Sequence, residues 1–101
     1  MSKLKIHIPK DPLADFCRRY HIRKLSVFGS ALRDDFDKTS DVDVLVEFRP
    51  GARVGMISLA AMEFELSEII GKSVDLNTPG FISPYFRDQV FSEAEVQYDA
   101  A

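Results

Sequence analysis

Gly29 and Ser30 form a turn that is suited to binding phosphate. They follow the apolar run 25–28 and open the segment 30–33. A short run of β-branched and aromatic residues that stops at glycine is typical of a buried strand that turns sharply, so we expect a strand and then a short helix here. The first N–H groups of a helix are free and glycine lets the backbone come close to a ligand, so this turn predicts an anion site.

Asp41 and Asp43 begin a second apolar run, which ends at Phe48. Side chains alternate along a strand, so the two carboxylates share one face and the valines at 42, 44 and 46 share the other. The two Cα atoms lie roughly 6.6 Å apart, and the carboxylates can lean together to hold two divalent ions about 3.5–4 Å apart. The alternative is that these aspartates only begin a solvated strand, but two like charges on one face repel each other unless a cation is present.

The spacing of these residues, Gly-Ser and then Asp-x-Asp after ten residues, resembles the signature of the nucleotidyltransferases of the DNA polymerase beta superfamily. The resemblance implies transfer of a nucleotide from ATP. It gives Asp41 and Asp43 the role of binding two Mg²⁺ ions. It implies that Gly29 and Ser30 bind the β- and γ-phosphates of ATP and that Arg33 neutralises phosphate charge.

The resemblance also assigns a role to Asp75, in the short predicted strand within 72–79. Members of the superfamily carry a third aspartate in a hydrophobic-Asp-Leu sequence, and Val-Asp75-Leu is similar to it. This implies that Asp75 shares a metal with the other two aspartates and accepts the proton of the attacking hydroxyl. Taken alone, the tripeptide has no specificity, and a solvent-facing residue of an edge strand is the alternative.

The elements before this motif are predicted from periodicity. Residues 3–8 alternate and predict a short edge strand, and Asp11-Pro12 predicts the start of a helix with Asp11 as its N-cap. An apolar stripe follows at helical spacing, which consists of Leu13, Phe16, Cys17 and Tyr20. Cys17 lies inside this stripe, so we interpret it as a core residue and not as a nucleophile.

The elements after the motif are a helix, a strand, a helix and a last strand. Residues 56–70 predict a helix that Gly71 ends, with Glu63 off its apolar face. Ser83-Pro84 predicts the cap and first residue of another helix, and Val96 with Tyr98 a final strand. The order predicts an α/β domain. The resemblance, which covers about residues 13–98, implies a small mixed sheet with helices packed on it, a polymerase-beta-like palm, as a single domain over 1–101.

Composition limits the other classes of function. The net charge of −3 argues against sequence-independent binding of nucleic acid, which needs clustered Lys and Arg. No apolar run approaches the ~20 residues that cross a bilayer, so we expect no membrane span. With one cysteine and no signal-peptide pattern, the sequence predicts a cytoplasmic protein.

As a single small domain, the chain resembles the minimal nucleotidyltransferases (MNT). Members of this size are commonly the antitoxin halves of HEPN/MNT toxin–antitoxin pairs. That resemblance implies a HEPN-type toxin as the partner and transfer of AMP to one of its tyrosines. Two alternatives stay open, an antitoxin that only masks its toxin and an enzyme that modifies a small molecule, although the latter normally has a second helical domain. The aromatic segment 81–86 is a candidate contact with the partner, with Phe86 expected in the core.

Overall fold

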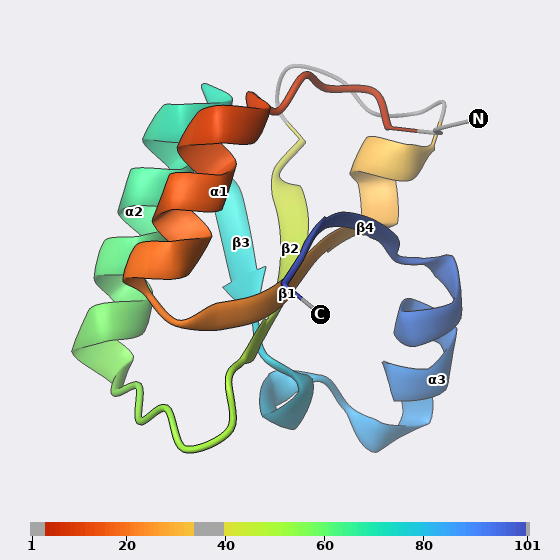
Figure 1. Ribbon diagram of the computed structural model, residues 1–101. Helices are drawn as coiled ribbons and strands as arrows, with labels where there is room; N and C mark the ends of the chain where they lie inside the picture. The colour runs from red at the N-terminus through yellow and green to blue at the C-terminus, as the bar shows by residue number, and fades with distance from the viewer. Residues whose placement is uncertain (1–3, 34–39, 101) are drawn as a thin grey trace.

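The computed structural model describes residues 4–33 and 40–100, and these form one sheet with helices on both sides (Figure 1). The strand order is β3-β2-β1-β4. Strand β2 is antiparallel to β1 and parallel to β3, and β1 is antiparallel to β4, so the predicted mixed sheet is confirmed. In chain order the elements are α1 (Lys10–Arg19), β1 (Ile22–Phe28), the 3-10 helix η1 (Gly29–Leu32), β2 (Val42–Phe48), α2 (Met56–Ile70), β3 (Val74–Asn77), the 3-10 helix η2 (Pro79–Phe81), α3 (Pro84–Glu93) and β4 (Glu95–Asp99).

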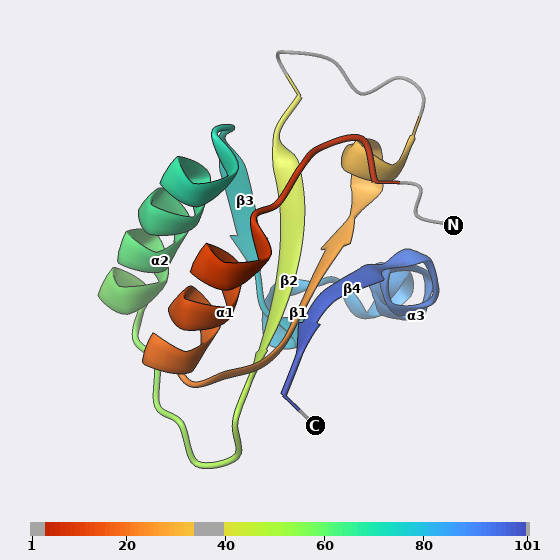
Figure 2. The ribbon, with the colours of Figure 1, turned by 45° about the horizontal axis from the view of Figure 1, so that its top comes forward.

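The core lies between the sheet and the pair α1 and α2, which cover one of its faces, whereas η1 and α3 lie on the opposite side (Figure 2). The helices and the strands supply side chains that are less than 5% exposed: Leu13, Phe16, Cys17, Ile22, Leu25, Val27, Val42, Val44, Val46, Met62 and Leu66. The valine face predicted in the second strand therefore lies in the core, as does the predicted stripe of the first helix except Tyr20, which is partly buried just after α1.

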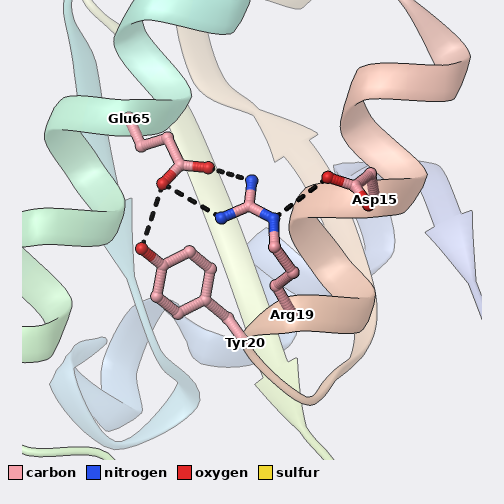
Figure 3. A network of polar contacts seen from close by, with 4 residues as sticks. All are labelled: Asp15, Arg19, Tyr20 and Glu65. Atoms are coloured by element: carbon pink, nitrogen blue, oxygen red, sulfur yellow. Dashed lines mark hydrogen bonds and ion pairs between the residues drawn. The ribbon is translucent and has the colours of Figure 1, made fainter.

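A network of polar contacts joins α1 to α2 (Figure 3). Arg19 of α1 donates to both carboxylate oxygens of Glu65 on α2, and its Nε lies 3.0 Å from Asp15. The hydroxyl of Tyr20 donates to the same Glu65 carboxylate, at 3.0 Å. These contacts fix how the two helices lie side by side on the sheet.

The predicted start of the chain is wrong in two details. Residues 4–9 form no strand; instead the Lys5 N–H donates to the Ala31 carbonyl, and the apolar side chain of Ile8 packs into the core. Helix α1 begins at Lys10 with Pro9 as its N-cap, so Asp11 lies within the first turn and caps nothing. Pro12 is tolerated there because the first N–H groups of a helix have no partner in the helix anyway.

The later elements agree better with the sequence. Helix α2 spans the predicted residues and ends at Gly71, whose φ of 79° is a left-handed conformation. The Ser83 side chain caps α3 by accepting from the Tyr85 N–H. The prediction that Phe86 lies in the core is wrong, because it is 61% exposed and α3 has no fully buried residue. Among the described residues, no helix is both long enough and apolar enough to cross a membrane.

Candidate functional site

The turn after β1 places Gly29 directly beneath the side chain of Asp43. Gly29 has a φ of 75°, which side-chain-bearing residues rarely adopt. A Cβ atom at this position would lie 3.2 Å from Asp43 Cγ and closer than 3.0 Å to Asp43 Oδ2. Glycine is therefore needed both for the backbone conformation and for the approach of the carboxylate. The helix predicted after it is a single turn of 3-10 helix, η1.

The sheet register brings Asp43 and Asp75 together, although they are far apart in the sequence. Strands β2 and β3 are parallel, and Asp43 is the direct partner of Asp75. Paired residues on neighbouring strands are about 4.8 Å apart, and their side chains lie on the same face. On its other side Asp43 pairs with Phe28, the last residue of β1. The carboxylates predicted as metal ligands thus come from two adjacent strands, at the edge of the sheet where η1 begins.

The electrostatics of Asp43 reflect this crowding. Partial burial raises its pKa above the usual value for aspartate, and the carboxylates of Asp75 and Asp41 raise the pKa further. A backbone hydrogen bond from Ser30 and the positive charge of Arg33 act in the opposite direction. The site therefore holds more negative charge than its own partners offset, and a bound cation would relieve the repulsion.

Ser30 and Arg33 both lie at the site that the sequence predicted for them. The Ser30 N–H, which the sequence suggested would hold phosphate, donates to the Asp43 carboxylate. The Ser30 hydroxyl donates to the Asp41 carbonyl at 3.3 Å and so joins the turn to the start of β2. Arg33 ends η1 with an exposed side chain. Asp41 is also exposed and lies just before the first residue of β2.

The donor set fits a hard divalent cation. Carboxylate oxygens are the ligands that Mg²⁺ prefers. The negative charges of Asp41 and Asp75 raise the pKa of Asp43, and a bound cation would lower it again. Within residues 4–33 and 40–100, however, no three His, Cys, Asp or Glu side chains already converge closely enough to hold one ion. The aspartates would have to turn toward one another when a metal binds.

The sequence patterns did not indicate the roles of three residues near the site. Glu63 was placed off the apolar face of its helix, but its carboxylate accepts from the Leu76 N–H of β3 at 2.9 Å. Ser67 accepts from the Val74 N–H at 3.0 Å. The Asn77 side chain donates to the carbonyls of Asp75 and Val44, at 3.1 and 3.5 Å. The available signal was the pair Glu63 and Ser67, one helical turn apart on a largely apolar helix.

A sheet that carries a glycine turn beside paired carboxylates is an arrangement expected of an enzyme that handles nucleotide phosphates. The sequence model described as "Nucleotidyltransferase domain" matches residues 11–96, and the chain belongs to this family. Among its relatives, the candidate protein adenylyltransferase MJ0435 of Methanocaldococcus jannaschii is 37% identical over 76 residues, which cover 75% of this chain and 80% of that protein. The protein adenylyltransferase MntA of Thermococcus cleftensis is 34% identical over 58 residues, or 57% of each chain.

Solved structures of the same fold confirm the predicted palm-like architecture. A structure described as a minimal nucleotidyltransferase has a TM-score of 0.70 and 29% identity, covering 85% of this chain and 86% of its own. A toxin–antitoxin structure with AMP-PNP has a TM-score of 0.73 at 17% identity, covering 91% of this chain and 74% of its own. A complex of a tri-AMPylated HEPN toxin with its MNT antitoxin, from Shewanella oneidensis, has a TM-score of 0.64 at 17% identity, covering 89% of this chain and 69% of its own.

Proposed function

We propose that the protein is a Mg²⁺-dependent nucleotidyltransferase that transfers AMP from ATP to a tyrosine hydroxyl of a HEPN-type toxin and thereby acts as its antitoxin. The observation that carries the proposal is the pairing of Asp43 with Asp75 on adjacent parallel strands, directly above the Gly29 turn. This combines a place for phosphate with carboxylates that need a cation.

The choice of AMP and of a protein acceptor is supported by the relatives. The similar proteins named above are described as protein adenylyltransferases, and one structure of the same fold contains a HEPN toxin that carries AMP groups. A structure with AMP-PNP, an analogue of ATP, has this fold as well. Mg²⁺ is supported by the oxygen-only donor set of the three aspartates.

In the proposed reaction, the acceptor oxygen forms a bond to the α-phosphorus of ATP, the bond to the β-phosphate oxygen breaks, and pyrophosphate leaves. Mg²⁺ held by Asp41, Asp43 and Asp75 would supply charge stabilisation for the attacking and leaving oxygens. Asp75, exposed at the sheet edge, accepts the proton of the acceptor hydroxyl. The Ser30 N–H, which donates to Asp43 in the ligand-free protein, would donate to phosphate, and Arg33 would add positive charge nearby.

A macromolecular acceptor is supported by the segment that follows β3. Phe81, Tyr85 and Phe86 are 61%, 93% and 61% exposed. Large exposed aromatic side chains in one segment are typical of protein interfaces. They lie in η2 and α3, and α3 is on the same side of the sheet as η1 (Figure 2). The toxin is therefore proposed to contact residues 81–86, as the sequence suggested.

The test combines transfer and neutralisation. Wild-type protein with ATP and Mg²⁺ should add the mass of an adenylyl group to a tyrosine of the co-purified toxin, and the variant with Asp41→Asn and Asp43→Asn should not. Both substitutions keep side-chain size while removing two negative charges, so circular dichroism should show an intact fold. If the double variant still neutralises the toxin fully and no adenylyl mass appears with the wild type, the protein masks its toxin without catalysis.

A further inference from the structure

Strand β3, which carries Asp75, is a short edge strand whose outer side meets a helix. Among the described strands it pairs only with β2. The Ser73 carbonyl, just before β3, accepts from the Val42 N–H of β2. Backbone groups alternate in direction along a strand, so the N–H groups of Val74 and Leu76 point away from β2. An edge strand commonly leaves such groups to solvent.

Here both outward N–H groups are taken by side chains of α2. Leu76 donates to Glu63 Oε2 at 2.9 Å, and Val74 donates to Ser67 Oγ at 3.0 Å. The Ser67 hydroxyl in turn donates to the Glu63 carbonyl at 2.7 Å. Because the hydroxyl proton of Ser67 points to that carbonyl, a lone pair of Ser67 Oγ can accept from the Val74 N–H.

The two acceptors on α2 reach the two donors on β3 because their spacing along the helix is close to the spacing of the donors along the strand. Glu63 and Ser67 are four residues apart, about 6 Å along a helix. Val74 and Leu76 are two residues apart, about 6.6 Å along a strand. The earlier helix residue binds the later strand residue, so α2 runs opposite to β3 and presents two acceptors at the spacing of its two donors. Asp75 lies between the two bonded residues.

We propose that Glu63 and Ser67 are positioning residues, which hold β3 in register so that Asp75 stays beside Asp43 when metal binds. The proposal rests on the metal role assigned above to the aspartates. Strand β2 is held by a neighbour on each side, whereas the four residues of β3 have a strand on one side only. The side-chain pair replaces the missing strand, and its loss frees the one strand that carries the third carboxylate.

The first measurement is made on metal-free protein. Replacing Glu63 by alanine removes the acceptor for Leu76. Loss of a hydrogen bond to a charged group should make amide exchange at Leu76 about tenfold faster or more. Glu63→Gln keeps a carbonyl acceptor and should retain slow exchange. Glu68→Ala is the matched control, because Glu68 is exposed on the same helix and the change in charge is the same. Unchanged exchange at Leu76 in Glu63→Ala would overturn the proposal.

The second measurement is Mn²⁺ affinity by calorimetry, which separates positioning from simple packing. Loss of an outer contact that orients a metal ligand costs about ten- to a hundredfold in metal affinity, and Glu63 and Ser67 would orient Asp75 through the backbone of its neighbours Leu76 and Val74. We expect that loss for Glu63→Ala and for Ser67→Ala, near wild-type affinity for Glu63→Gln, and no change for Glu68→Ala. If Glu63→Ala exchanges faster at Leu76 but binds Mn²⁺ as the wild type does, or if Glu63→Gln fails to restore binding, the positioning role is wrong.

A double-mutant cycle with Asp75→Asn completes the test. If Glu63 acts through Asp75, the Glu63→Ala substitution should cause little further loss of Mn²⁺ affinity once Asp75 is already asparagine. Additive losses would mean that Glu63 acts on the metal by another route and would overturn the proposal. Wild-type protein that binds no Mn²⁺ would instead overturn the metal assignment itself, and the exchange at Leu76 distinguishes these two failures.

Discussion

The Gly29 turn makes the sharpest prediction, because the structure separates two effects of adding a methyl group there. A residue other than glycine with a φ near 75° costs roughly 1–2 kcal/mol. In a domain of this size, 1 kcal/mol lowers the melting temperature by about 4–8 °C. The new Cβ also displaces the Asp43 carboxylate by several tenths of an ångström, because it would stand within 3.0 Å of Oδ2.

Gly51→Ala is the matched control. Gly51 has a φ of 85°, but a Cβ there meets no atom within 4 Å. Both alanine variants should therefore lose a similar amount of stability, since a short carboxylate can turn aside at little cost to folding. Only Gly29→Ala should lose function, because a misplacement approaching 1 Å at a reacting centre costs about a hundredfold in rate.

The assay measures thermal melting, Mn²⁺-dependent ATP binding by calorimetry, and adenylyl transfer to the toxin. The expected result is that the two variants melt alike, that Gly51→Ala binds ATP and transfers as the wild type does, and that Gly29→Ala transfers about a hundredfold more slowly. If Gly29→Ala retains transfer within a fewfold of Gly51→Ala, then the close approach of Gly29 and Asp43 does not matter for function, and the assignment of the site to this turn is wrong.

Three further predictions concern residues outside the site. Burial raises the pKa of the Cys17 thiol to about 12, so iodoacetamide should label it only after unfolding, and fast labelling of native protein would contradict its core position. The hydrogen bond from Arg19 lowers the pKa of Glu65, so Glu65→Gln should melt at a lower temperature than wild type at pH 7. This difference in melting temperature should disappear as the pH falls through the lowered pKa of Glu65, and a difference that stays constant with pH would contradict the ion pair. Phe86→Ser should weaken toxin binding while leaving ATP binding intact, because Phe86 is exposed, and pull-down with the toxin checks this.

Local patterns predicted the part of the site that is close together in sequence. Gly29 and Ser30 were identified from a strand that stops at glycine, and Asp43 from alternation along one strand; the structure places all three in contact or directly adjacent. Such features depend on backbone periods that any short window contains. The roles of these residues in binding metal and phosphate remain predictions.

The long-range part of the site could not be predicted in the same way. The register that pairs Asp43 with Asp75 is set by strand pairing across 32 residues, which neither local run contains. Glu63 was placed only off the apolar face of its helix, because helical periodicity separates apolar from polar positions but does not say what a polar residue faces. The hydrogen bond from the Ser30 N–H to the Asp43 carboxylate joins residues of two different elements, so no local pattern could indicate it, and the phosphate role of Ser30 remains a prediction.

Helix α2 carries three functions on three sides, and this explains why its length and phase matter. Met62 and Leu66 point into the core, Glu63 and Ser67 bond β3, and Glu65 bonds α1. Each residue of a helix is turned by about 100° from the last, so these sets occupy fixed neighbouring stripes. An extra residue within α2 would turn one part of the helix against the other by that angle, so the core contacts and the support of β3 could not both be kept. The position of Asp75 therefore depends on the same helical phase that packs the core.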